Sequence, residues 1–177
     1  AYVDNSRRAT LTDVAESALR RMQRDIRRAL PNSIRIIEDS DGNGVTLELL
    51  HLVDGGRYRA FKSNVLTIPN DPNSALICIP TKTDSPCDTL DFSTPASSDN
   101  SFDVIGKLNN FSSIPSGSQL FIYPVDTDSN YKAINSATVN NSSTATHIIF
   151  DAAANFTFPD PSPQQRFFIV DTPVTYH

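Results

Sequence analysis

The sequence predicts an α+β fold in which a long N-terminal α-helix packs on an antiparallel β-sheet domain. Residues 11–31 (LTDVAESALRRMQRDIRRALP) carry apolar side chains at the three- and four-residue spacing of one helix face. After Pro31 the apolar residues alternate with a period of two, which is typical of half-buried strands. The chain shows no internal repeat and no interdomain linker. We therefore expect residues 1–30 to form the helix and residues 31–177 the β-domain, as one globular unit.

The apolar stripe of the helix predicts that the helix packs along its length on another element. Pro31 ends the helix, because proline lacks a backbone donor and restricts the residue before it. Thr10 or Thr12 is a candidate N-cap, although the preceding AYVDNSRRA contains no glycine or proline and allows an earlier start. If the stripe packs on the β-domain, Leu19 and Ile26 are buried core residues. The stripe consists of Leu11, Val14, Ala15, Ala18, Leu19, Met22, Ile26, Ala29 and Leu30.

Short alternating runs after the helix predict the strands of the β-domain. SIRIIE, GVTLELLHLV and RYRAF are joined by DSDGNG and DGG, whose residues tolerate positive φ, so we expect a three-stranded meander. Further apolar runs follow at VLTI, ALICI, SQLFIYPV, THIIF and RFFIVDTPVTY. The segments TPASSDNS and NSATVNNSSTAT between them are predicted to be long polar loops.

Charge is distributed unevenly along the chain. The first 30 residues hold seven arginines against four acids, a local charge of +3, which leaves −8 for the other 147 residues given the net charge of −5. Such asymmetry indicates different partners for the two parts. The basic helix face is either a solvated surface whose arginine stems cover apolar groups, or a contact with nucleic acid, a membrane surface or an acidic protein. Aromatic residues do not accompany the basic ones, which weakens the nucleic-acid alternative.

Two cysteines, Cys78 and Cys87, enclose the eight residues between them in CIPTKTDSPC. A disulfide closing this loop would contribute roughly 2–3 kcal/mol, and two unpaired thiols are the alternative. The spacing does not match a CxxC metal or redox pair.

Residues typical of catalysis are sparse. None of the common nucleophile, phosphate-loop or zinc motifs occurs, and the three histidines are His51, His147 and His177. We therefore expect a protein that is not an enzyme and that uses no cofactor. His51 lies on an apolar strand face and is interpreted as a structural histidine.

The loop DSDGNG at residues 39–44 resembles the first half of an EF-hand loop through Asp39, Asp41 and Asn43. The second half fails, because position 12 of that register is Leu50 and the nearest acid is Glu48. We therefore expect a plain hairpin turn here and no metal site.

At LRRMQRDIRRALPNSIRI and LELLHLVDGGRYRAF the chain resembles the minor pilins and pseudopilins of type IV pilus and type II secretion systems. Within that family it looks most like the minor pilins of mannose-sensitive haemagglutinin (MSHA) pilus biogenesis. The resemblance is most specific over residues 16–62, and beyond them it rests on the order of strands and loops.

The resemblance implies that residues 2–30 are the lower half of one long helix, whose C-terminal end packs on a pilin-like β-domain. Members carry a short leader with a cleavage and N-methylation site, followed by an apolar helix that anchors them in the inner membrane and later packs in the filament core. The chain starts with Ala1 rather than Met, so we expect a fragment that lacks this segment. Some pseudopilins also bind calcium through β-domain loops, which the resemblance does not locate here.

The sequence and the resemblance together predict a non-catalytic assembly subunit that helps to initiate or cap a pilus-like filament. The resemblance implies an inner membrane-anchored protein with a periplasmic domain, found in the filament after assembly, and periplasmic export favours the Cys78–Cys87 disulfide. Other minor and major pilins would be its partners, and nucleic acid would not. The basic helix face is then an assembly interface, formed by Arg20, Arg24 and Arg27. The main alternative is a glycan-binding adhesin-like β-domain, followed by a hydrolase.

Overall fold

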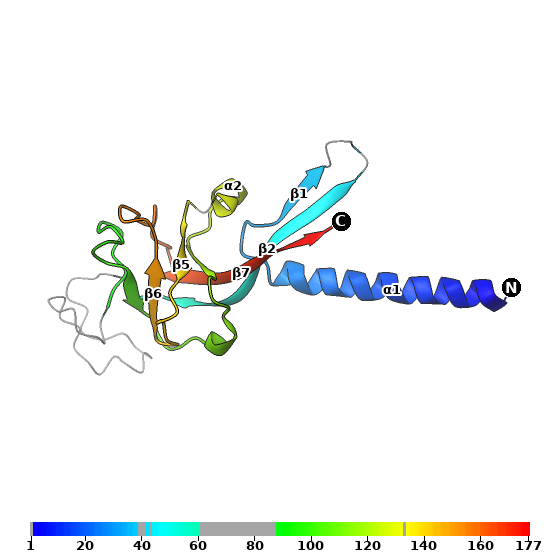
Figure 1. Ribbon diagram of the computed structural model, residues 1–177, viewed down its shortest axis with the longest axis horizontal. Coiled ribbons are helices and arrows are strands. Elements are labelled where there is room, and N and C mark those ends of the chain that lie inside the picture. The colour runs from blue at the N-terminus through cyan, green and yellow to red at the C-terminus, as the bar shows by residue number, and fades with distance from the viewer. Residues whose placement is uncertain (1, 39–41, 43, 61–87, 133) are drawn as a thin grey trace.

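The structure, a computed structural model, describes residues 2–38, 42, 44–60, 88–132 and 134–177. The elements of this part of the chain are α1 (Tyr2–Arg27), β1 (Arg35–Glu38), β2 (Val45–Arg57), β3 (Ser101–Asp103), η1 (Phe111–Ser113), β4 (Gln119–Ile122), α2 (Thr127–Tyr131), β5 (Ser136–Val139), β6 (His147–Asp151) and β7 (Arg166–Tyr176). The strand pairs are antiparallel, so the α+β class predicted from the sequence is confirmed at this level. Helix α1 projects from the β-domain, with the N-terminus at its far end (Figure 1).

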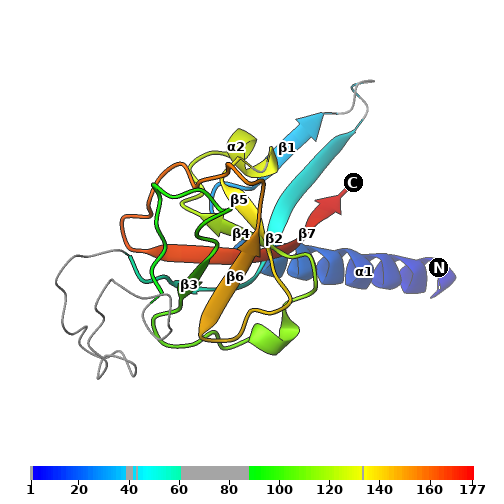
Figure 2. The same cartoon turned by 60° about the vertical axis from the view of Figure 1, so that its left-hand side comes forward.

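The seven strands form one sheet in the order β1-β2-β7-β4-β5-β6-β3. β2 and β7 are the longest strands, with 13 and 11 residues. β7 pairs with β4 only over Phe167–Val170, and its later residues pair with β2 alone. β1, residues 45–50 and residues 173–176 therefore form a three-stranded wing, which extends past the rest of the sheet on the side where α1 leaves (Figures 1 and 2).

The sheet buries apolar side chains on both faces, and β7 contributes to both. Phe167 and Ile169 point into the larger core, while Val170 and the half-buried Phe168 belong to the smaller one. Alternation along a strand places successive side chains on opposite faces, which explains this division. The smaller core also contains Leu30, Leu50 and Phe121, with Tyr131 packed against it. The larger core is built from Tyr58, Leu90, Phe102, Val104, Leu108, Leu120, Ile122, Ala137, Val139, Ile148, Phe150, Phe158, Phe167 and Ile169.

The predicted turn at DGG is wrong, because β2 runs straight through Gly55 and Gly56. A Cβ atom on Gly55 would meet the Phe167 backbone oxygen at 2.9 Å, and one on Gly56 would meet the Phe167 ring at 3.0 Å. The glycines therefore allow β7 and its aromatic side chain to approach β2 closely. The predicted three-stranded meander is likewise not found, since β2 pairs with β1 and β7, and Tyr58 and Ala60 form isolated bridges.

The expected packing of the helix stripe along the β-domain is also wrong. Leu11, Val14 and Leu19 are 69%, 61% and 64% exposed, and Ile26 is 38% exposed. Only the end of the helix reaches the sheet. The Leu30 backbone N–H donates to the Leu50 oxygen at 2.8 Å, and the Leu30 side chain is 1% exposed.

The helix boundaries differ from the predicted ones. The hydroxyls of Thr10 and Thr12 donate to carbonyl oxygens one turn earlier, so both lie inside the helix rather than at its cap. At the other end α1 stops at Arg27, because the carbonyl of Arg28 already accepts from Leu52 of β2 at 2.8 Å. The tertiary hydrogen bond therefore ends the helix before Pro31 does.

The predicted polar loop NSATVNNSSTAT contains a strand instead. β5 pairs with β4 and β6 inside the sheet, and its Ala137 and Val139 are core residues. A strand of small polar and apolar residues fits this central position because its neighbours provide the bulky side chains. The predicted strands VLTI and ALICI lie outside the described residues.

The different burial of Leu30 and Leu19 can be tested by replacing each of them with alanine. Leu30→Ala should lower the free energy of unfolding by roughly 2–5 kcal/mol, because the buried side chain leaves a cavity. The same change at Leu19 should alter it by less than about 0.5 kcal/mol, since that side chain lies in solvent. Urea titration followed by tyrosine fluorescence measures both. Equal losses would show that the helix stripe is covered by the β-domain in solution.

Candidate functional site

The apolar face of α1 is a large unpartnered surface. Leu11, Val14 and Leu19 recur at helical spacing on a 26-residue helix, and all three are more than half exposed. Contiguous apolar surface of this kind on a folded protein marks an interaction site. The two cores formed by the described residues do not include this face.

The arginines predicted as an assembly interface lie on the opposite side of the helix. Arg20, Arg24 and Arg27 follow one another at four- and three-residue spacing, and all are exposed. Arg20 pairs with Glu16 on the same helix, with side chains 75% and 56% exposed. Arg24 and Arg27 form no ion pair with any described residue. The basic face is thus accessible, and its role stays a prediction.

A groove separates the helix from the wing. It has a volume of about 510 Å³ and is lined by Ser17, Ala18 and Arg21 of α1 and by Val174, Thr175 and Tyr176 of β7. The Tyr176 hydroxyl donates a hydrogen bond to the carboxylate of Asp25, which raises the pKa of Tyr176. This contact fixes the direction in which the helix leaves the sheet.

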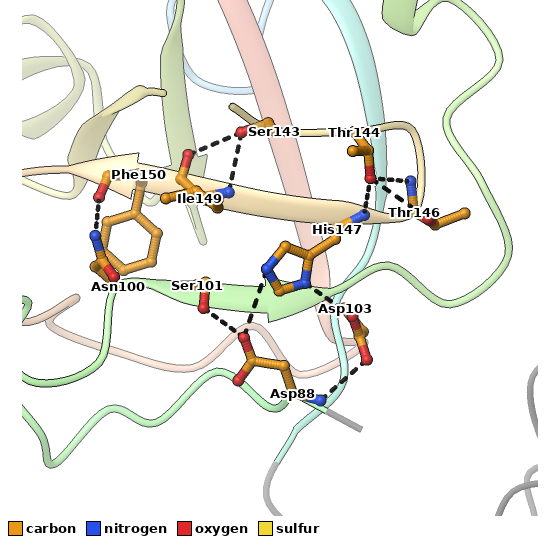
Figure 3. Close-up of polar contacts among 10 residues, drawn as sticks. All are labelled: Asp88, Asn100, Ser101, Asp103, Ser143, Thr144, Thr146, His147, Ile149 and Phe150. Carbon is orange, nitrogen blue, oxygen red and sulfur yellow. Dashed lines mark hydrogen bonds and ion pairs between the residues drawn. The ribbon is translucent and has the colours of Figure 1, made fainter. Parts of the chain in front are cut away.

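A cluster of polar side chains surrounds His147 at the edge of the sheet (Figure 3). The Nδ1 atom of His147 is 2.9 Å from Asp103 Oδ1, and its Nε2 atom is 3.9 Å from Asp88 Oδ2. Ser101 donates its hydroxyl proton to the same Asp88 carboxylate. The Asp88 backbone N–H in turn donates to Asp103 Oδ2 at 3.0 Å.

These contacts join β6, β3 and the chain at residue 88, so their first consequence is structural. A nucleophilic serine would need its hydroxyl against the imidazole, whereas Ser101 faces the carboxylate of Asp88 (Figure 3). His51 has a similar environment, with its Nδ1 atom 3.0 Å from Asp171 Oδ1. Both histidines thus contact an acid, as a catalytic histidine does, yet neither lines the pocket at Pro31 and Phe168 or the groove beside α1. The absence of catalysis stays a prediction.

Several predicted sites fall partly or wholly outside the described residues. The Cys78–Cys87 pair lies there, as do Asp39, Asp41 and Asn43 of the loop interpreted as a hairpin turn. The strands that flank this loop pair antiparallel, with Glu38 opposite Val45. Among the described residues no three histidine, cysteine or acidic side chains are grouped as metal ligands.

Sequence reasoning did not find the His147 cluster. Its members Asp88, Ser101, Asp103 and His147 come from three separate segments, and β3 had no recognisable pattern because it is three residues long. The sequence of so short a strand does not indicate which other strand it pairs with. Only the pairing of Asp103 with His147 across β3 and β6 brings the group together.

No protein-family model, no curated protein and no solved structure matches this chain. Of the helices in the described part, none has the length and hydrophobicity that a bilayer span requires.

The half-buried carboxyl group of Asp99, close before β3 in the chain, makes the stability of the fold depend on pH. Burial, followed by the charge of Asp88, raises the pKa of Asp99 from 3.8 to about 6. The folded state therefore holds this proton more tightly than the unfolded state, and its contribution to stability is lost as pH rises from about 4 to about 6. Asp99→Asn should unfold at higher urea concentration than the wild type above pH 6, and the difference should vanish below about pH 4.

The exposed Asp160→Asn provides the matched control, because it removes the same charge away from the cluster. It should show no gain that depends on pH. An equal gain for Asp99→Asn at every pH would show that burial and Asp88 do not act on this carboxyl group.

Proposed function

We propose that this chain is a non-catalytic assembly subunit of a type IV pilus-like system, of the minor pilin or pseudopilin class. The observation that carries the proposal is the projecting helix with an exposed apolar face. The helix is long, it contacts the sheet only at its C-terminal end, and its leucines lie in solvent. A filament in which such helices pack together supplies the missing partner for this face.

The remaining surfaces support the same proposal. Arg24 and Arg27 lie on the side of the helix away from the leucines, where they are available to acidic surface on a neighbouring subunit. The β-domain is acidic in composition, with −8 of charge over residues outside the first 30, so neighbouring copies or relatives of similar composition would complement the basic face. The groove between helix and wing offers a further contact at the base of the helix.

On this proposal the anchor precedes Ala1 in the full protein. It spans the inner membrane and leaves the β-domain in the periplasm until the subunit enters the filament. Its partners are other minor and major pilins. The gene sequence upstream of the codon for Ala1 tests this directly: it should encode a short basic leader and an apolar segment of about 20 residues. Its absence would remove the basis of the proposal.

The helix face is tested by the double change Leu11→Asp and Leu19→Asp in the full-length protein. Each buried leucine contributes about 1.5–3 kcal/mol to an interface, so association with the other pilins should weaken by roughly tenfold or more. The melting temperature should stay unchanged, because both side chains are exposed in the subunit. Filament-bound subunit is quantified by immunoblotting of sheared pili in the source bacterium.

Val125→Asp is the matched control, since this residue is 48% exposed and lies in the β-domain. It should leave the filament-bound fraction at the wild-type level. The triple change of Arg20, Arg24 and Arg27 to Glu should reduce this fraction, and rising salt should weaken the wild-type association. Normal incorporation of the Asp double variant would contradict a packed helix face.

A further inference from the structure

An open apolar pocket lies on the smaller-core face of the sheet, apart from helix α1. It has a volume of about 310 Å³, at the lower end of the range for ligand pockets. Three separate chain segments build its wall, around residues 31, 123–124 and 162–168. Its lining includes the proline rings of Pro31, Pro124 and Pro163, the aromatic rings of Tyr123 and Phe168, and the side chain of Arg166.

The wall is held in an unusual backbone conformation at three points. Tyr123, Asn32 and Gln165 have φ values of 50°, 57° and 58°, and each lies in the lining or next to a lining residue. Non-glycine residues in this left-handed region are uncommon and cluster at ligand-binding sites. Tyr123 is the strongest case, because a bulky residue is disfavoured there and its side chain remains 38% exposed.

Hydrogen bonds fix this shape before any ligand binds. The Asn32 side-chain amide donates to the carbonyl oxygens of Pro124 and Val125 at 3.0 and 3.2 Å. The Asn130 amide donates to the carbonyls of Pro31 and Asn32 at 3.3 and 2.9 Å. The pocket is thus preorganised, which lowers the entropic cost of binding.

Arg166 brings positive charge to the pocket lining, and Arg57 lies beside it in the sheet. Arg57 of β2 and Arg166 of β7 are directly opposite each other in the sheet, so both side chains lie on the same face. Like charges in this position repel. The Arg57 guanidinium donates to the Gln164 carbonyl at 3.1 Å, and neither arginine forms an ion pair with a described carboxylate. An anionic group on a ligand would offset this repulsion.

The lining offers few free hydrogen-bond acceptors. The carbonyls of Pro31 and Pro124 accept from asparagine amides, that of Gln164 from Arg57, and that of Ser162 from the Gln165 backbone N–H. The lining presents mainly rings, with the Arg166 guanidinium, the Gln164 side-chain amide and the Tyr123 hydroxyl among its polar groups. An apolar side chain next to a carboxylate matches the rings and the guanidinium.

We propose that this pocket binds an extended peptide segment in which an apolar side chain stands next to a carboxylate. The apolar side chain lies among the proline and aromatic rings, and the carboxylate pairs with Arg166, whose positive charge the neighbouring Arg57 reinforces. The inference is independent of the filament proposal, because it uses neither the helix face nor the groove beside the wing.

Two probe peptides test the proposal on the chain as it stands. N-acetyl-Pro-Phe-Asp-amide should shift the backbone amide NMR signals of residues 123 and 164–168, with saturation below about 10 mM. The Asn counterpart of this peptide should bind at least about fivefold more weakly, because it lacks the charge for the arginines. Arg166→Gln should weaken binding of the Asp peptide and reduce its advantage over the Asn peptide, whereas the exposed Lys107→Gln should leave both affinities unchanged.

Tyr123→Asn adds a second variant, because Asn tolerates left-handed backbone while removing the ring. It should weaken both peptides by about fivefold or more without lowering the urea midpoint. The proposal is overturned if neither peptide shifts these signals, or if Arg166→Gln leaves the preference for Asp intact. Glucuronate or inorganic phosphate shifting the same signals as strongly as the Asp peptide would also overturn it, in favour of a sugar-acid or simple anion site.

Discussion

The antiparallel pairing of β2 with β7 is the interaction on which the rest of the structure depends. The two strands share nine residue pairs that run from Arg57 opposite Arg166 to Leu47 opposite Tyr176. At one end the pairing requires Gly55 and Gly56, because only glycine leaves room for the Phe167 backbone and ring. At the other end it carries the wing. A single strand pair thus joins the packed cores to the part of the molecule that meets the helix.

The connection between α1 and this strand pair explains how a helix with few tertiary contacts keeps a defined direction relative to the sheet. The residues after Arg27 leave the helix and bond to β2, through Arg28 to Leu52 and through Leu30 to Leu50. Tyr176 then holds Asp25 from the other side. The helix is therefore fixed at its last turns by two strands, while its earlier turns make no comparable contact. This arrangement presents the apolar and basic faces without covering either.

The sequence predicted some elements well, and the reasons are physical. β7 has the bounds of the run RFFIVDTPVTY, because a strand with both faces partly buried reads as a continuous apolar segment. The sequence predicts a turn at Gly55 and Gly56 and a loop at β5, and both predictions are wrong. Neighbours distant in sequence decide that these small residues lie in strands. The helix stripe showed that a partner is needed, and amphipathicity alone does not say whether that partner is intramolecular. The Asp103–His147 contact and the Arg57–Arg166 pair likewise arise only from strand register.

The exposed helix face also bears on the stability of the helix. Isolated helices in water are marginal, and most helices in proteins are stabilised by tertiary packing of an apolar face. α1 has this packing only near Leu30, so its first turns depend on intrinsic propensity and on local pairs such as Glu16 with Arg20. A partner that covers Leu11, Val14 and Leu19 would therefore contribute burial energy and also stabilise the helix around these residues. On the proposed function, burial of the apolar face and stabilisation of the helix therefore occur together when the subunit enters the filament.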